Sequence, residues 1–193
     1  MNQQIQEHCL DDSALFTEVD LLIIQEAIAA TICAYDPDEQ AIYQPALYDN
    51  ENPLSPVARI LALADISSLG MEGVDSYNQE GSLLVLEENP DLIPILLNQE
   101  TKTQAVDNSE LLENIRQRLL KRARFQVNFA KSRLKRYPQE VASFPTEVIP
   151  ILKSNVFRYL TPETIQEIES TTPTSEDTNL EVLVNFFRFK PNP

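Results

Sequence analysis

The most regular feature of this chain is the recurrence of apolar residues at intervals of three and four, the spacing of one face of an α-helix. The first such segment, residues 17–34, opens like a capping box at Thr17-Glu18-Val19-Asp20. Its broad apolar face is expected to be buried and consists of Leu21, Ile24, Ile28, Ile32 and Tyr35. The next stretch, DPDEQAIYQPALYDNENP, carries three prolines and predicts a long connecting loop.

A second apolar segment carries one carboxylate near its centre. Pro56 lies where a helix can begin, and the sequence ARILALADISSLG ends at Gly70, which we expect to close that helix. Asp65 then falls in the last turn or two, where burial without a partner would be costly. Either Asp65 points to solvent, or a cationic or hydrogen-bonding group meets it. All three glycines, Gly70, Gly73 and Gly81, follow this helix and are expected to let the chain turn sharply.

The longest periodic segment, residues 109–137, predicts a helix of about 43 Å that forms the spine of the fold. Shorter helices are expected over residues 147–159, from Thr161-Pro162-Glu163 onward, and over residues 180–189. Residues 81–86 are interpreted as the start of a buried helix or as an extended connection. The fold class predicted is all-α, a single compact multi-helix domain over residues 1–193 with one long central amphipathic helix.

Length and cysteine content set further limits. The 193 residues suit one domain that buries most of its core without disulfides. Cys9 and Cys33 make no disulfide framework, and no apolar run reaches the roughly 18 residues of a membrane span. The N-terminal sequence does not match a secretory signal. We expect a cytoplasmic protein that does not enter a membrane.

The net charge of −15 is divided unevenly along the chain. Residues 1–101 hold one basic residue against nineteen acidic ones, a net of −18. Residues 102–193 hold fourteen basic against eleven acidic residues, a net of +3. An acidic surface of this size argues against nucleic acid as a general partner. It is compatible with bound cations, with a basic protein partner, or with solubility alone, and solubility is the leading interpretation because charge is a weak guide to function.

Nine of the fifteen basic residues lie between Arg116 and Arg136, on the long predicted helix. Arginine and aromatic side chains that alternate on one helix face can bind phosphates and stack bases. We favour a second interpretation, in which this face docks on the acidic first half of the chain and the arginine stems cover apolar surface. A third is that one or two arginines, with Arg118 and Arg122 as the candidates, hold a small anionic ligand, because guanidinium suits phosphate.

Catalytic side chains are scarce. The single histidine, His8, lies near the N-terminus, and the cysteines do not have the spacing of a structural zinc site. His8 and Cys9 are adjacent, and adjacent residues on a helix point about 100° apart, which does not suit a catalytic pair. We assign no catalytic residue.

The residues around Asp65 carry a family resemblance. PVARILALADISSLG, preceded by DLLIIQEAIAATI, resembles the rear half of HD-domain proteins, the metal-dependent phosphohydrolase superfamily, over roughly residues 20–72. The motif of that family is a His, then an adjacent His-Asp pair, then a later Asp. The resemblance implies that Asp65 matches the last metal ligand. It also implies a divalent ion, manganese or magnesium, that polarises a phosphate and activates water.

The chain departs from this motif in its first part. It has no His-Asp pair, because its only histidine is followed by Cys9, and His8 is left as the candidate for a second metal ligand. One interpretation is that the front portion of the family motif has been lost or lies on another polypeptide. The other is that the fold keeps the helices without the metal, so that Asp65 caps a helix or pairs with an arginine.

We therefore expect a degenerate HD-domain-like protein that lacks the complete metal site and acts by binding or regulation, with a small anionic ligand or a protein as partner. The alternative is a metal-dependent phosphohydrolase acting on a phosphoester or nucleotide, completed by unusual ligands or by a second chain. A third class is a plain helical interaction protein unrelated to either. No cofactor is assigned from the residues themselves, and the pattern assigns no oligomeric state.

Overall fold

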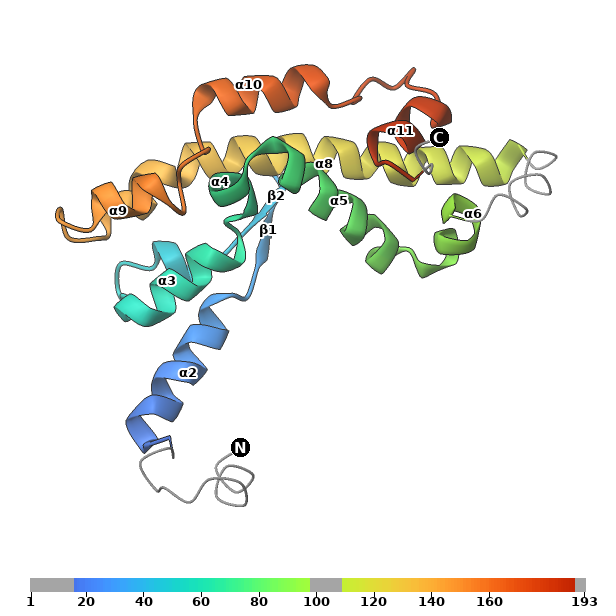
Figure 1. Ribbon diagram of the computed structural model, residues 1–193. Helices are drawn as coiled ribbons and strands as arrows, with labels where there is room; N and C mark the ends of the chain where they lie inside the picture. The colour runs from blue at the N-terminus through green and yellow to red at the C-terminus, as the bar shows by residue number, and fades with distance from the viewer. Residues whose placement is uncertain (1–15, 98–108, 190–193) are drawn as a thin grey trace. The chain divides into compact units, whose positions relative to one another are not determined.

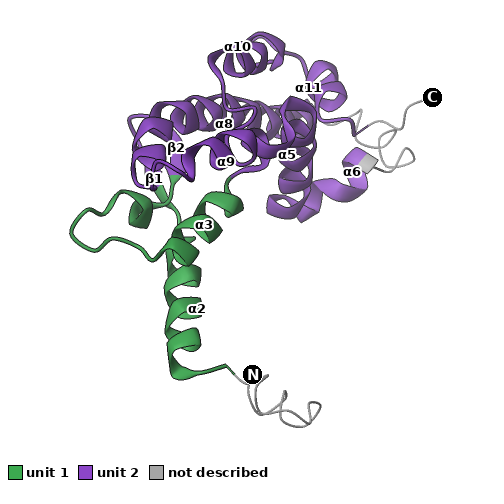
Figure 2. Cartoon of the chain, turned by 60° about the vertical axis from the view of Figure 1, so that its left-hand side comes forward, with its two compact units in different colours: residues 1–34, 43–66 green, residues 35–42, 67–193 purple. Residues whose placement is uncertain are grey.

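The computed structural model describes residues 16–97 and 109–189, which form two compact units (Figures 1 and 2). Unit 1 holds the described residues up to Ala34 together with residues 43–66. Unit 2 holds residues 35–42 and the described residues from Ser67 onward. Apart from one two-stranded sheet, the described residues are built into helices and their connections, which confirms the all-α prediction. A single domain over residues 1–193 stays a prediction.

Unit 1 is a pair of helices. Helix α2 (Glu18–Ala30) begins at Thr17, whose hydroxyl accepts a hydrogen bond from the Asp20 backbone N–H, while the Asp20 carboxylate accepts one from the Thr17 N–H. This confirms the predicted capping box, and the helix ends short of the predicted boundary. Helix α3 (Pro56–Asp65) packs against α2, and the hydroxyl of Ser55 caps its first turn.

The stretch between α2 and α3 contains regular structure that the sequence did not predict. Strands β1 (Ala34–Asp36) and β2 (Ala41–Tyr43) pair with each other, and a 3₁₀ helix, η2 (Pro45–Tyr48), follows. The prediction of a long loop is therefore wrong for these residues. The Asp36 carboxylate accepts hydrogen bonds from two backbone N–H groups, at 3.0 and 3.2 Å, and Gln40 has a left-handed φ of 49°. Together these features fold the chain back as a hairpin.

The segment predicted as one helix from Pro56 to Gly70 contains two helices. Helix α4 (Ser68–Glu72) follows α3 as a separate helix and ends at Gly73, where a φ of 84° turns the chain into α5 (Val74–Glu88). Gly73, not Gly70, therefore makes the sharp turn. Gly70 lies inside α4, where an added Cβ would stand 2.0 Å from the carbonyl oxygen of Val156. Only glycine permits this close approach.

Residues 81–86 are helical, as one of the two interpretations predicted, but they lie in the second half of α5 and do not start it, and Leu83 and Leu84 are exposed. Gly81 faces the long helix α8 (Ser109–Ala142), because an added Cβ would stand 1.9 Å from the side-chain nitrogen of the buried Gln126. Beside it, the Tyr77 hydroxyl donates a hydrogen bond to the Gln126 carbonyl oxygen at 2.6 Å. The small residue and the buried polar contacts allow α5 and α8 to approach closely.

Helix α8 confirms the predicted spine. It spans 34 residues, which corresponds to about 51 Å. It continues past the predicted end and includes Pro138, which removes one i→i−4 hydrogen bond. One face of α8 joins the main core cluster of unit 2, with contributions from α5, η3 (Pro90–Leu92), α6 (Ile93–Leu97) and the C-terminal segment. The buried members of this cluster are Val85, Leu92, Leu96, Ile115, Leu119, Leu120, Ala123, Leu183, Val184, Phe187 and Phe189.

Three shorter helices complete unit 2, namely α9 (Ile149–Ser154), α10 (Pro162–Thr171) and α11 (Leu180–Phe186). The Thr161 hydroxyl caps α10 and a proline occupies its first position, as predicted. Both α10 and α11 pack against α8 (Figure 1). Within residues 16–97 and 109–189, no helix combines the length and the apolar character that crossing a bilayer requires.

Candidate functional site

Asp65 is the last residue of α3, and its exposed side chain has a hydrogen-bonding partner within unit 1. The side-chain amide of Gln44 donates a hydrogen bond to Oδ2 of Asp65 at 2.9 Å, and Gln44 itself is fully buried. The sequence offered two alternatives for Asp65, exposure to solvent or a hydrogen-bonding partner, and the structure shows both. The side chain reaches solvent, and a neutral hydrogen-bonding group meets it.

The thiol of Cys33 lies close enough to Asp65 to be affected by its charge. Desolvation raises the pKa of the Cys33 thiol, and the negative charge of Asp65 raises it further. The thiol also donates a hydrogen bond to the Thr31 carbonyl oxygen at 3.6 Å. Because the thiolate is the form that attacks a substrate or binds a metal, this environment does not favour Cys33 as a nucleophile or ligand.

The two predicted metal ligands cannot be compared in space, because His8 lies outside the described residues. In the part of the chain that the structure describes, no group of three or more His, Cys, Asp or Glu side chains is arranged to hold a metal ion. Of the predicted pair, Asp65 alone has a known position. The assignment of Asp65 and His8 to a metal site stays a prediction.

The predicted anion-binding residues, Arg118 and Arg122, lie one turn apart on α8, and each faces a carboxylate. The guanidinium of Arg118 is 2.7 Å from a carboxylate oxygen of Asp91, and that of Arg122 is 3.3 Å from one of Glu88. Burial lowers the pKa of Arg122, while the charge of Glu88 opposes this shift. The Arg122 guanidinium also lies 5.1 Å from the ring centroid of Phe125. Binding of an anion here would compete with these carboxylates, and the anion-binding role stays a prediction.

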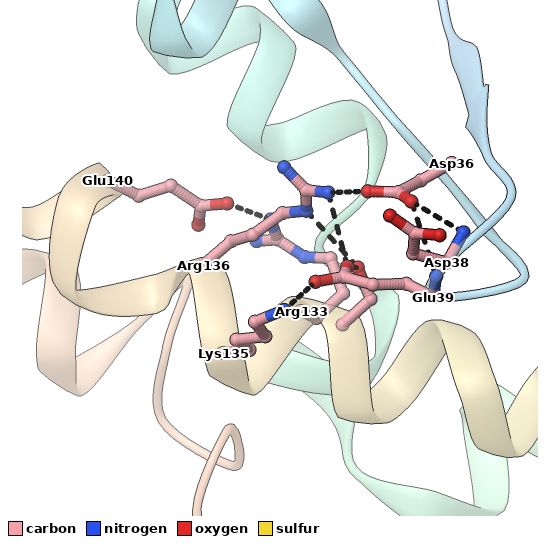
Figure 3. Close-up of polar contacts among 8 residues, drawn as sticks. Asp36, Asp38, Glu39, Arg133, Lys135, Arg136 and Glu140 are labelled. Atoms are coloured by element: carbon pink, nitrogen blue, oxygen red, sulfur yellow. Dashed lines mark hydrogen bonds and ion pairs between the residues drawn. The ribbon is translucent and has the colours of Figure 1, made fainter.

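Farther along α8, cations pair with carboxylates of the β1–β2 hairpin (Figure 3). One guanidinium nitrogen of Arg136 lies 2.6 Å from Asp36 Oδ2 and 3.1 Å from Glu39 Oε2. The Ser132 hydroxyl and the Lys135 ammonium group donate hydrogen bonds to Glu39. Asp36 and Glu39 belong to the acidic first half of the chain, so intramolecular docking of the basic helix on that half is observed at this hairpin.

Glu39 lies at the centre of this cluster. Burial alone would raise the pKa of its carboxyl group, but the hydrogen bonds from Lys135 and Ser132, together with the charge of Arg136, outweigh burial and hold the pKa at about 2. The side chain is only 13% exposed, so solvent screens these interactions weakly. The cluster therefore fixes residues 35–42 on α8.

A second ion pair lies inside α8 itself. Arg133 donates a hydrogen bond to Glu140, seven residues later, and their side chains are 5% and 0% exposed. Charges buried to this degree are costly unless they are paired, so each residue depends on the other. The sequence contained one signal for this pair, because the spacing of seven places both residues on the same side of a helix.

The helix pair of unit 1 buries small residues and exposes large ones. The buried positions on α2 and most of those on α3 are alanines, namely Ala27, Ala30, Ala58 and Ala62. The predicted buried face of α2 is wrong, because α3 packs on its alanine side. Leu21, Ile28 and Ile32, which were expected in the core, are 40%, 61% and 67% exposed, and Tyr35 is exposed as well. We call the outer face of α2 the surface formed by the exposed Leu21, Leu22 and Ile28 of the helix together with the exposed Ile32, which lies two residues beyond its end.

Comparisons of the chain with protein-family models, with curated proteins and with solved structures found no match. The resemblance to HD-domain proteins stays a prediction from the sequence. Two features of unit 1 were missed from the sequence. Gln44 is 21 residues from Asp65 and gave no spacing signal. The outer face of α2 did give one, because Val19, Leu22 and Ile23 extend the apolar character of the segment beyond the predicted face.

Proposed function

We propose that this chain is a degenerate HD-domain-like protein that acts by binding a protein partner and not by catalysis. The observation that carries the proposal is the outer face of α2, where four large aliphatic side chains are exposed. Soluble proteins rarely expose contiguous apolar patches larger than a few hundred Å², and such patches mark interaction sites. A helix with apolar residues on more than one side is favoured where more than one side is covered, and among the described residues α2 contacts α3 and, to a smaller extent, η2.

The contact of Asp65 with Gln44 supports a structural use of the carboxylate. Gln44 immediately precedes η2, so the hydrogen bond ties the start of that helix to the C-terminal end of α3. Burying the NH2 group of an amide without a hydrogen-bond acceptor would lower the stability of the fold, and Asp65 provides the acceptor for Gln44. The carboxylate that the family resemblance implies as a metal ligand is thus engaged in holding unit 1 together.

A cytoplasmic setting is part of the proposal. Cys33 is exposed and carries a free thiol. Free exposed thiols are stable in a reducing compartment, whereas oxidising compartments favour disulfides.

Metal titration and phosphoester hydrolysis test the catalytic alternative directly. Calorimetric titrations with manganese and magnesium chloride, and release of phosphate from p-nitrophenyl phosphate, are compared for the wild type and Asp65→Ala. We expect neither metal binding nor turnover that depends on Asp65. Glu51→Ala, which removes an exposed carboxylate of the same unit, is the matched control. Turnover that Asp65→Ala abolishes and Glu51→Ala preserves would overturn the proposal and establish a hydrolase.

A further inference from the structure

We propose that the outer face of α2 binds a basic amphipathic helix of a partner protein. This inference rests on the proposed function and specifies the chemistry of the partner. Two properties of the described residues carry it, namely the geometry of the face and the net charge of unit 1.

The geometry suits a helix laid along α2. Leu21 and Ile28 lie two turns apart on one line of α2, Leu22 lies one residue after Leu21, and the exposed Ile32 follows the end of the helix at Ala30. Amphipathic helices bind apolar surfaces through side chains that recur at intervals of three, four and seven residues.

The net charge of unit 1 favours a basic partner. The described residues of unit 1 carry one basic side chain, Arg59, against six carboxylates, a net of −5. These carboxylates are Glu18, Asp20, Glu26, Asp49, Glu51 and Asp65. Glu18 is exposed and lies one turn before Leu22 on the same face. Lysine and arginine at the edges of a partner helix would face this negative field, which favours association and orients it.

The same charge argues against a second copy of this chain. Two outer faces brought together would also bring together two acidic units, and each whole chain carries a net charge of −15. Like charges opposed across an interface weaken association. The negative charge of unit 1 would attract a basic partner and repel a second copy of this chain.

Peptide binding tests the inference with the full-length protein. Three fluorescein-labelled peptides of about 18 residues share the same stripe of leucines at helical spacing. All their remaining positions are lysine in the first peptide, glutamine in the second and glutamate in the third. Fluorescence anisotropy measures their dissociation constants. We expect the lysine peptide to bind at least about tenfold more tightly than the glutamate peptide, a difference of about 1.4 kcal/mol.

The variants locate the binding surface. In the double variant Leu22→Ser with Ile28→Ser, affinity for the lysine peptide should fall at least about tenfold, because two of the four large side chains of the face are lost. The matched control is Leu83→Ser with Ile151→Ser in unit 2, whose side chains are 59% and 61% exposed, against 65% and 61% for Leu22 and Ile28. The control should keep wild-type affinity, and circular dichroism checks that both variants keep their helices.

The possible failures are separable. If all three peptides bind equally and the α2 double variant weakens each, the basic character of the partner is overturned while the proposed binding function stands. If the α2 double variant weakens the binding of none of the peptides, the basic character of the partner and the proposed binding function are both overturned. If light scattering shows a dimer that the α2 double variant dissociates, the occupant is a second copy, and the inference is again overturned.

Discussion

The two units of this chain use their helices in opposite ways. In unit 2, α8 buries large apolar residues such as Leu119 and Leu120, and its cations pair with carboxylates on neighbouring elements. In unit 1, α2 and α3 bury four alanines and one leucine, Leu63, and expose leucine, isoleucine and valine. A helix whose large side chains face inward is stabilised by its own chain. A helix whose large side chains face outward gains stability only when something else covers them.

The two units also differ in how much their buried side chains stabilise them. Burial of an apolar side chain stabilises a protein by about 0.8 kcal/mol per methylene group, so an alanine contributes far less than a leucine. The contact between α2 and α3 therefore leaves much of the apolar surface of unit 1 unused. We expect substitutions in unit 2 to change the free energy of unfolding strongly, and substitutions on the outer face of α2 to change binding.

The largest effect is expected when the buried ion pair of α8 is broken. Glu140→Ala leaves Arg133 buried without its carboxylate partner, and should lower the free energy of unfolding by about 3–5 kcal/mol. Chemical denaturation followed by circular dichroism measures the change. Glu147→Ala, at an exposed position soon after α8, is the control and should behave like the wild type.

A compensating variant sharpens this prediction. Replacing the pair together, Arg133→Met with Glu140→Leu, removes both buried charges and should restore most of the lost stability. If Glu140→Ala unfolds no more easily than Glu147→Ala, the pair does not stabilise unit 2, and the contrast between the units is weaker than proposed.

A smaller loss is expected where α4 meets the chain before α10. In Gly70→Ala the new Cβ would stand 2.0 Å from the backbone oxygen of Val156, and the Gly70 carbonyl also accepts a hydrogen bond from Tyr159 at 2.8 Å. Backbone must shift to relieve this contact, at a cost of about 2–3 kcal/mol. Thermal unfolding should show the loss. Gly81→Ala is the comparison, because its Cβ meets the end of a side chain, that of Gln126, and should cost less. Equal costs would contradict the close backbone approach.

Acid should selectively weaken the hairpin contact of unit 2. The pKa of Glu39 is lowered from 4.5 to about 2, so its contribution to stability is complete above pH 4.5 and is lost as the pH falls toward 2. The stability difference between the wild type and Glu39→Gln should therefore be largest near pH 6 and shrink through this window. Denaturation at a series of pH values measures it. A difference that is constant with pH would show that the charge of Glu39 is not what holds the hairpin.

The local signals in the sequence predicted more of the fold than of the site. The capping box at Thr17, the Thr161-Pro162 start of α10 and the long apolar stripe of α8 all depend on residues close in sequence, and all are confirmed. The hairpin was missed because Asp36 and Glu39 are held by Arg136, about a hundred residues away. The exposed face of α2 was missed because periodicity shows which residues share a side, and not which side the neighbouring helix covers.

The smallest effect on stability is expected at the outer face of α2 itself. Ile28→Ser replaces a side chain that is 61% exposed, and should change the free energy of unfolding by no more than about 0.5 kcal/mol. Leu119→Ala in the core of unit 2 is the comparison, and should cost about 2–5 kcal/mol because it leaves a cavity in a fully buried position. Urea denaturation of the two variants measures both values under the same conditions. A cost for Ile28→Ser that approached that of Leu119→Ala would mean that the side chain is already covered in the isolated protein, and the outer face of α2 would then be core and not a docking surface.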